Sequence, residues 1–345
     1  MFTNLLGNNE AKETLRRLVA GARLPGSLLF IGDEGIGKKL FALEFAKILN
    51  CRNRVGVEAC DECSSCKRIS RSKFPPFGNA DDDKERIIWS EHADVAMVRP
   101  YKQIIRVSPI RELEREANFR PFEGAGRVFI IEDADYMNDQ ASNALLKTLE
   151  EPQTSSHLIL TTPNPTALLA TIRSRCQVIR FAPIPVDELE SFLIQSQELA
   201  DSDAKLLARL ARGSLGRALN ADLETYRERR AAMLAVLKAL TLTGNAAQLL
   251  RAAEEMAAGD RDEYELTLEV LETLIRDAWA LRLERPSEGI INIDLLKELK
   301  AIAGEMQSRH ARAWLQAIEE LRGTLEVNIN RRVAGDALFL TMASA

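Results

Sequence analysis

The sequence predicts a three-layer α/β domain of the P-loop type, followed by a region built from helices alone. An apolar run at residues 27–31 leads directly into a glycine-rich loop, and residues 40–50 then show a helical apolar pattern. Apolar runs and helical patterns alternate as far as Phe181, which is the order typical of a parallel sheet covered by helices. Strand signals end at Pro183, and only helical patterns follow.

The elements of the α/β region can be assigned in chain order. Asn8 or Asn9 can cap a first helix, and the strand at residues 27–31 comes next. Further strands are expected at residues 95–98, 128–131, 157–162 and 178–181, and further helices at residues 108–118 and 139–151. Pro152 stops the last of these helices. Residues 70–91 show no periodicity and are expected to form a loop.

The loop after the first strand has the spacing of a phosphate-binding loop. Gly32, Gly35 and Gly37 precede Lys38, which gives the pattern G-x-x-x-x-G-K between a strand and a helix. Glycines let the backbone turn tightly, so that N–H groups and the helix N-terminus point at one anion, while Lys38 would reach the outer phosphates of ATP or ADP. The next residue should be Ser or Thr, whose hydroxyl holds Mg²⁺, but here it is Lys39. The sequence therefore predicts the P-loop fold and leaves nucleotide binding and hydrolysis doubtful.

An acidic pair follows the strand at residues 128–131. Glu132 and Asp133 stand where P-loop enzymes hold Mg²⁺ and polarise the attacking water. The usual order is Asp followed by Glu, and the inverted order changes the reach of both side chains. Together with Lys39, this inversion weakens the case for a chain that hydrolyses nucleotide itself.

Four of the five cysteines lie within sixteen residues. Cys51, Cys60, Cys63 and Cys66 include two C-x-x-C steps, and four thiolates at this spacing can form a tetrahedral shell around Zn²⁺. The alternative is four incidental reduced thiols, but random cysteines rarely cluster at ligand spacing. No histidine or open position suggests a catalytic metal, so the predicted zinc site is structural.

Length and composition limit the class of protein. A chain of 345 residues suggests two or three domains, and its net charge of −5 argues against a protein that binds nucleic acid through bulk charge. No apolar run approaches membrane-spanning length, and the first residues do not resemble a signal peptide. We therefore expect a cytoplasmic protein.

The region after Pro183 divides into two groups of helices. Two short helices are expected at residues 187–195 and 202–212, and Ser214 can cap a third that carries Arg217 in its first turn. Six longer amphipathic helices are expected at residues 226–242, 245–258, 262–284, 292–305, 309–327 and 332–343. The predicted domains are thus residues 1–182, 183–224 and 225–345.

Six separate stretches of the chain carry a family resemblance. They are the P-loop strand and loop at 28–38, the Cys₄ insert directly after the P-loop helix, Arg-Pro-Phe-Glu-Gly at 120–124, Asn-Ala-Leu-Leu-Lys-Thr-Leu-Glu-Glu-Pro at 143–152, Ser-Arg-Cys at 174–176 and Gly-Ser-Leu-Gly-Arg-Ala at 213–218. In this order they resemble the AAA+ clamp-loader family of bacterial DNA polymerase III. A P-loop alone would be weak evidence of this, but the joint occurrence and order of the six stretches are highly specific. The resemblance covers nearly the whole chain.

The resemblance implies roles for the matching residues. Gly32, Gly35, Gly37, Lys38 and Lys39 form the nucleotide loop, Glu132 and Asp133 occupy the Walker B positions, and Asn164 falls near the sensor-1 position. Arg217 matches the sensor-2 arginine, although it could also be an ordinary residue on a helix surface. Arg175 matches the arginine finger that is presented to ATP on a neighbouring subunit; without the family context it would be taken for a solvated surface charge.

The resemblance also implies an assembly. The expected protein is an AAA+ domain with a zinc module at residues 51–66, a small helical lid and a helical collar that carries most of the contacts between subunits. It would join gamma/tau and delta subunits in a hetero-oligomer that opens a sliding clamp and places it on primer–template DNA. One alternative is a gamma/tau-type motor that hydrolyses ATP, which Lys39 and Glu132 disfavour. The other is a scaffold with no nucleotide role, which Arg175 disfavours.

Overall fold

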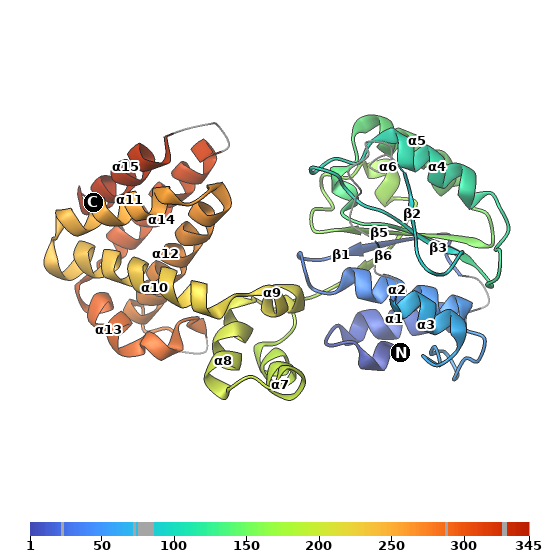
Figure 1. Ribbon diagram of the computed structural model, residues 1–345, viewed down its shortest axis with the longest axis horizontal. Helices are drawn as coiled ribbons and strands as arrows, with labels where there is room; N and C mark the ends of the chain where they lie inside the picture. The colour runs from blue at the N-terminus through green and yellow to red at the C-terminus, as the bar shows by residue number, and fades with distance from the viewer. Residues whose placement is uncertain (22–23, 72–73, 75–85, 287–288, 326–329, 345) are drawn as a thin grey trace. The chain divides into compact units, whose positions relative to one another are not determined.

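The computed structural model describes residues 1–21, 24–71, 74, 86–286, 289–325 and 330–344. It divides into two compact units. Unit 1 consists of Met1–Phe192 and Ala211–Leu219, and unit 2 consists of Leu193–Leu210 and Asn220–Ala345. Figure 1 labels most of the helices and strands of both units. The finer division into three domains stays a prediction.

Unit 1 contains a six-stranded sheet with the order β2-β3-β4-β5-β1-β6. Its strands are β1 (Ser27–Ile31), β2 (Ile88–Trp89), β3 (Val95–Val98), β4 (Arg127–Ile131), β5 (Ser156–Thr162) and β6 (Gln177–Arg180). All neighbours from β3 to β6 pair in parallel, which confirms the five predicted strands and the parallel sheet. The residues of β4 and β5 are all buried, because both faces of the sheet are covered.

Helices cover the sheet on its two faces (Figure 1). One face carries α1 (Asn9–Ala20), α2 (Lys38–Asn50) and α3 (Ser64–Arg71), and the other carries α4 (Val107–Ala117), α5 (Asp139–Glu150) and α6 (Ala170–Arg173). Each layer has its own apolar core, around Phe45 of α2 on one side and around Leu145 of α5 on the other. Three short helices follow: α7 (Val186–Gln197), α8 (Asp201–Leu210) and α9 (Leu215–Asn220).

The prediction of a loop over residues 70–91 is wrong at both ends. Ser70 and Arg71 belong to α3, and Ile88 and Trp89 form β2, which pairs antiparallel with β3. The Trp89 ring packs edge-on against Phe129 at 6.1 Å, so a tertiary contact fixes this short edge strand where the sequence has no periodicity. Residues 72–73 and 75–85 of the predicted loop lie outside the described residues.

Unit 2 has a separate helical core. Its long helices are α10 (Leu223–Lys238), α11 (Ala246–Ala258), α12 (Arg261–Arg282), α13 (Leu296–Glu305), α14 (Ser308–Leu325) and α15 (Arg331–Ser344). These six confirm the six predicted helices, with a π-helical segment, Ala239–Thr243, where the first was expected to continue. Tyr264, Trp314 and Phe339 lie buried in one core. Within the described part of the chain, no helix has the length and apolar character needed to cross a membrane.

Candidate nucleotide, metal and trans-acting sites

The glycine loop, the acidic pair and Asn164 meet at one edge of the sheet. They follow β1, β4 and β5, which are adjacent and parallel, so the carboxyl ends of these strands lie together. Gly35 and Gly37 have φ angles of +73° and +99°, a region that favours glycine, and α2 begins directly after them. The loop therefore has the backbone of a phosphate-binding loop at the N-terminus of a helix.

The Lys38 side chain bonds to the backbone of its own glycine loop. Its Nζ atom donates to the carbonyl oxygens of Gly32, at 2.6 Å, and Asp33, at 2.7 Å, and the residue is only 6% exposed. Burial lowers the pKa of Lys38, while Asp133 and other nearby carboxylates oppose the shift. This ammonium group would have to break two short hydrogen bonds before it could bind a phosphate.

Lys39 forms an ion pair with the first acid of the pair. The Lys39 Nζ atom lies 3.1 Å from Glu132 Oε2, so an ammonium group is placed where Mg²⁺ and its hydroxyl ligand would be expected. Burial raises the pKa of the neighbouring Asp133, and the charge of Glu132 raises it further. Both effects disfavour a second carboxylate charge beside Glu132. The arrangement weakens the attraction of this edge for a divalent cation.

The start of α9 lies against the glycine loop. The N–H group of Gly216 donates to the carbonyl oxygen of Gly35 at 2.8 Å, and a Cβ atom on Gly35 would lie 2.4 Å from Ser214 Oγ. Ser214 Oγ accepts from the backbone N–H of Arg217 at 3.2 Å, as predicted for a helix cap. The backbone nitrogen of Arg217 would lie 3.5 Å from the same Cβ atom, while the residue itself is exposed.

Asn164 is held by its own turn. Its side-chain oxygen accepts from Thr166 Oγ1 at 2.6 Å, and its backbone N–H donates to Thr162 Oγ1 at 3.0 Å. Thr162 in turn donates to Asp135 Oδ1 at 2.7 Å. The sequence assigned no role to Asp135 or Thr162. The available signal was that Thr162 ends β5 and that Asp135 follows closely after the adjacent strand β4.

Arg175 lies away from the glycine loop. It precedes β6, whose Gln177 pairs with Leu28, whereas the loop follows Ile31 at the other end of β1. About 13 Å of strand separates the two levels. Arg175 donates through Nη2 to Glu150 Oε1 at 2.7 Å and through Nη1 to the Thr171 carbonyl at 3.0 Å. Its side chain is one-third exposed, so this guanidinium group faces the outside of unit 1 instead of its own loop.

The four clustered cysteines come together as predicted. The Sγ atoms of Cys51, Cys60, Cys63 and Cys66 all lie within 4.8 Å of one another. A tetrahedral zinc site with Zn–S bonds of about 2.3 Å requires sulfur–sulfur distances of about 3.8 Å, so small shifts suffice. The N–H groups of Cys60 and Cys63 donate to the Sγ atoms of Cys51 and Cys60, at 3.2 and 3.3 Å. Four soft sulfur donors with N–H···S support fit a structural metal ion.

Two cysteine thiols are shifted in opposite directions. Burial raises the pKa of Cys63, but hydrogen bonds from backbone N–H groups and neighbouring thiols outweigh it and bring the value to about 6. Burial and the adjacent thiols raise the pKa of Cys66. A cluster that can release one proton easily is suited to metal capture, because metal binding requires thiolates.

Polar contacts fasten the cysteine module on two sides. Lys47 Nζ lies 2.6 Å from Asp61 Oδ1, and Arg16 Nε lies 2.6 Å from Glu58 Oε1. On the other side, Arg68 of α3 makes two hydrogen bonds with the carboxylate of Glu123, at 2.7 and 2.5 Å. The module is therefore joined to α1, α2 and the segment before β4.

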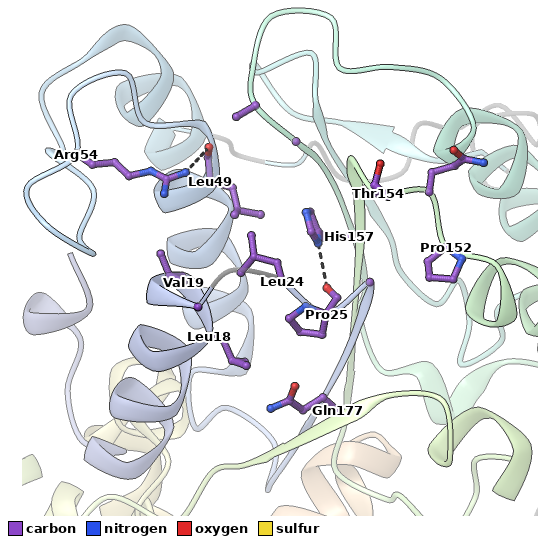
Figure 2. A pocket seen from close by; sticks show the side chains of 15 residues that line it. Leu18, Val19, Leu24, Pro25, Leu49, Arg54, Pro152, Thr154, His157 and Gln177 are labelled. Atoms are coloured by element: carbon purple, nitrogen blue, oxygen red, sulfur yellow. Dashed lines mark hydrogen bonds between the residues drawn. The ribbon is translucent and has the colours of Figure 1, made fainter.

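A separate cavity of about 740 Å³ lies at the amino ends of β1, β5 and β6 (Figure 2). Leu24, Pro25, Arg54, His157 and Gln177 are among its lining residues. The His157 ring bonds the Pro25 carbonyl through Nδ1 at 3.0 Å, and burial lowers its pKa. None of the site residues predicted from the sequence lines this cavity.

Comparison with known proteins gives consistent matches. A profile of the family described as "DNA polymerase III, delta subunit" matches residues 7–185, more than half of the chain. The chain is 28% identical over 309 residues to DNA polymerase III subunit delta′ of Bacillus subtilis (89% of this chain, 88% of the relative). It is 28% identical over 311 residues to subunit delta′ of Escherichia coli (89% and 85%) and 29% identical over 253 residues to subunit tau of B. subtilis (72% and 41%).

Proposed function

Because the chain belongs to the DNA polymerase III delta-subunit family, we propose that it acts as the delta-prime-type subunit of a clamp-loader complex. It joins gamma/tau and delta subunits in a cytoplasmic hetero-oligomer that loads the sliding clamp onto primer–template DNA during replication. Residues 1–182 form its AAA+ domain, residues 183–224 its lid, and residues 225–345 the collar that contacts the other subunits. The domain assists ATP hydrolysis by its neighbour without performing it.

The ion pair between Lys39 and Glu132 carries this proposal. A hydrolytic P-loop needs Mg²⁺ between its Ser or Thr hydroxyl and a carboxylate, and here an ammonium group lies 3.1 Å from that carboxylate. The similarity to a tau subunit favours a motor as the second candidate function. The same ion pair argues against that motor. It is equally compatible with a scaffold subunit whose glycine loop is retained only as part of the fold.

Arg175 is the residue proposed to act on the neighbour. An arginine supplied in trans stabilises charge on the transferred phosphoryl group and is typically worth ~10³-fold or more in rate at its site. Its place at the end of the strands remote from its own loop supports a role in trans, as does its partial exposure. A pure scaffold would need no such residue.

The test is the substitution Arg175→Ala in the reconstituted complex. Folding, metal content and complex assembly should stay intact, while the ATPase rate stimulated by clamp and DNA falls. Because other sites in the complex have their own arginines, the loss should be partial. Arg175→Lys is the matched control for geometry: it keeps the charge but not the planar fork of donors, so it should also be impaired. An unchanged ATPase rate and unchanged clamp loading in Arg175→Ala would reject the proposal.

A further inference from the structure

The Arg175 side chain forms hydrogen bonds within unit 1. Its Nη2 atom donates to Glu150 Oε1 at 2.7 Å, and its Nη1 atom donates to the Thr171 carbonyl oxygen at 3.0 Å. A guanidinium group has five N–H donors, and among the described residues these two bonds leave three of them for another acceptor. The side chain is therefore held in one direction and still has N–H groups that can donate to another acceptor.

Glu150 is itself well placed to hold the arginine. It is the last residue of α5, which is capped at its other end by Asn138, whose side chain accepts from Ala141 N. Pro152 follows closely, and α5 packs against α6, which carries Thr171. The C-terminal end of a helix also attracts a cation. Charge, hydrogen bonding and helix position thus act together on one guanidinium group.

We propose that Glu150 is a positioning residue for the trans-acting arginine. It holds the Arg175 guanidinium so that the remaining N–H groups face a neighbouring subunit's phosphates. This inference rests on the proposed function of Arg175 and adds a residue to it. Glu150 does not touch the nucleotide in this proposal, and it acts only through Arg175.

A competing role for Glu150 predicts the opposite result. If its carboxylate mainly neutralised Arg175 and kept it from the neighbour, removing the negative charge would raise the ATPase rate. If Glu150 positions Arg175 through its hydrogen bond, Glu150→Gln should largely keep the rate, because the amide oxygen still accepts from Nη2. Glu150→Ala should lower the rate, because the bond is lost.

The experiment measures clamp- and DNA-stimulated ATPase of the complete complex containing each variant. In Glu150→Ala, the kcat of the complex should fall by less than in Arg175→Ala, with KM for ATP unchanged. The affected site should slow by about two- to fivefold, the range that a partly exposed ion pair can supply, while the other sites keep their rate. Glu150→Gln should recover most of that loss. Glu151→Ala is the matched control: it removes an exposed carboxylate one residue further along and should leave kcat unchanged.

A double variant separates positioning from a structural effect. Arg175→Ala/Glu150→Ala should be no slower than Arg175→Ala alone, because Glu150 then has nothing left to position. A further loss in the double variant would overturn the inference, and so would an unchanged rate in Glu150→Ala or an increased rate in both Glu150 variants. If Arg175→Ala itself has no effect, the proposed function fails first, and the two failures are therefore distinguishable. Should Glu150→Ala fail to assemble, Glu150→Gln decides between positioning and neutralisation.

Discussion

Lys39 replaces a magnesium-binding hydroxyl by an ammonium group, and its contact with Glu132 has a direct kinetic consequence. We expect the isolated chain to show no meaningful ATPase activity and weak or absent ATP binding, because the cation site is already occupied by a charge of the same sign. A nucleotide titration with and without Mg²⁺ checks the binding, and a phosphate-release assay checks the turnover. Turnover by this chain alone, abolished in Lys38→Ala, would instead support the motor.

The contact between Arg68 and Glu123 makes the stability of the fold depend on pH. Hydrogen bonds from Arg68 lower the pKa of Glu123 to about 2, from an ordinary value of 4.5, and outweigh the effect of burial. A carboxyl group with a lowered pKa stabilises the fold above its unfolded pKa, and this stability is lost as the pH falls through the folded pKa. Glu123→Gln should therefore cost about 1 kcal/mol at pH 7.

The cost of Glu123→Gln should shrink steadily as the pH falls from about 4.5 toward 2. Urea denaturation of both proteins across this range measures the difference. Glu62→Gln, which neutralises an exposed carboxylate near the same module, should have little effect at any pH. A cost for Glu123→Gln that stays constant down to pH 2 would contradict the assigned role of the Arg68–Glu123 pair.

Helix α3 has few buried apolar residues, so a bound metal ion would have to supply stability that an apolar core supplies elsewhere. This helix contains Cys66 and Ile69 as its buried apolar residues, and it is otherwise polar. We propose that Cys51, Cys60, Cys63 and Cys66 hold one structural Zn²⁺, which supplies most of the stability of residues 51–71. Purified protein should contain one zinc ion per chain, and chelation should expose this segment to proteolysis.

A matched pair of cysteine variants tests the zinc site. Cys63→Ser should lose the metal, since a hydroxyl is a poor ligand for zinc beside three thiolates. Cys176→Ser should keep it, because Cys176 lies outside the cluster, where burial raises its pKa to about 12. Metal analysis that finds no zinc in the unaltered protein, with four freely titratable thiols, would rule the site out.

Elements with an apolar run or a helical pattern of their own were predictable from the sequence, whereas α3 and β2 were not. The strands around Phe30 and Ile130 and the six helices of unit 2 have patterns long enough to identify. By contrast, α3 depends on the cysteine cluster and on Arg68, and β2 depends on Trp89 packing against a neighbouring strand. Both also depend on a contact with a distant residue, Glu123 for Arg68 and Phe129 for Trp89, so local periodicity cannot reveal them.

The same limit applies to the candidate site. Spacing identified Lys38, Lys39 and the four cysteines, because each motif lies within one short segment. It could not show that Lys39 pairs with Glu132 across 93 residues, nor that Arg175 pairs with Glu150. The first contact depends on the order of the strands in the sheet and the second on the packing of α5 against α6, and both are properties of the folded domain.

At the scale of the whole molecule, the helices of unit 2 have a core of their own. The buried cluster around Leu271 runs from Met233 to Met342 and contains no residue of unit 1. Its first long helix is capped by Asp222, whose side chain accepts from the N–H groups of Glu224 and Thr225. A fragment should therefore begin at residue 220, before this cap, to keep α10 intact.

We expect a fragment of residues 220–345 to fold alone and to bind the collars of partner subunits, because six amphipathic helices offer more apolar surface than one layer can bury.

Val333 and Leu340 are 61% and 52% exposed and lie seven residues apart, on one face of α15. Val333→Asp or Leu340→Asp should weaken partner binding by about tenfold or more, because a charge would then be buried at the contact with the partner. Leu283→Asp, at an exposed position beyond the end of α12, serves as the control. Sedimentation of the fragment with purified partner subunits measures the binding. An inert fragment, together with assembly by residues 1–219 alone, would assign the contacts to the α/β domain instead.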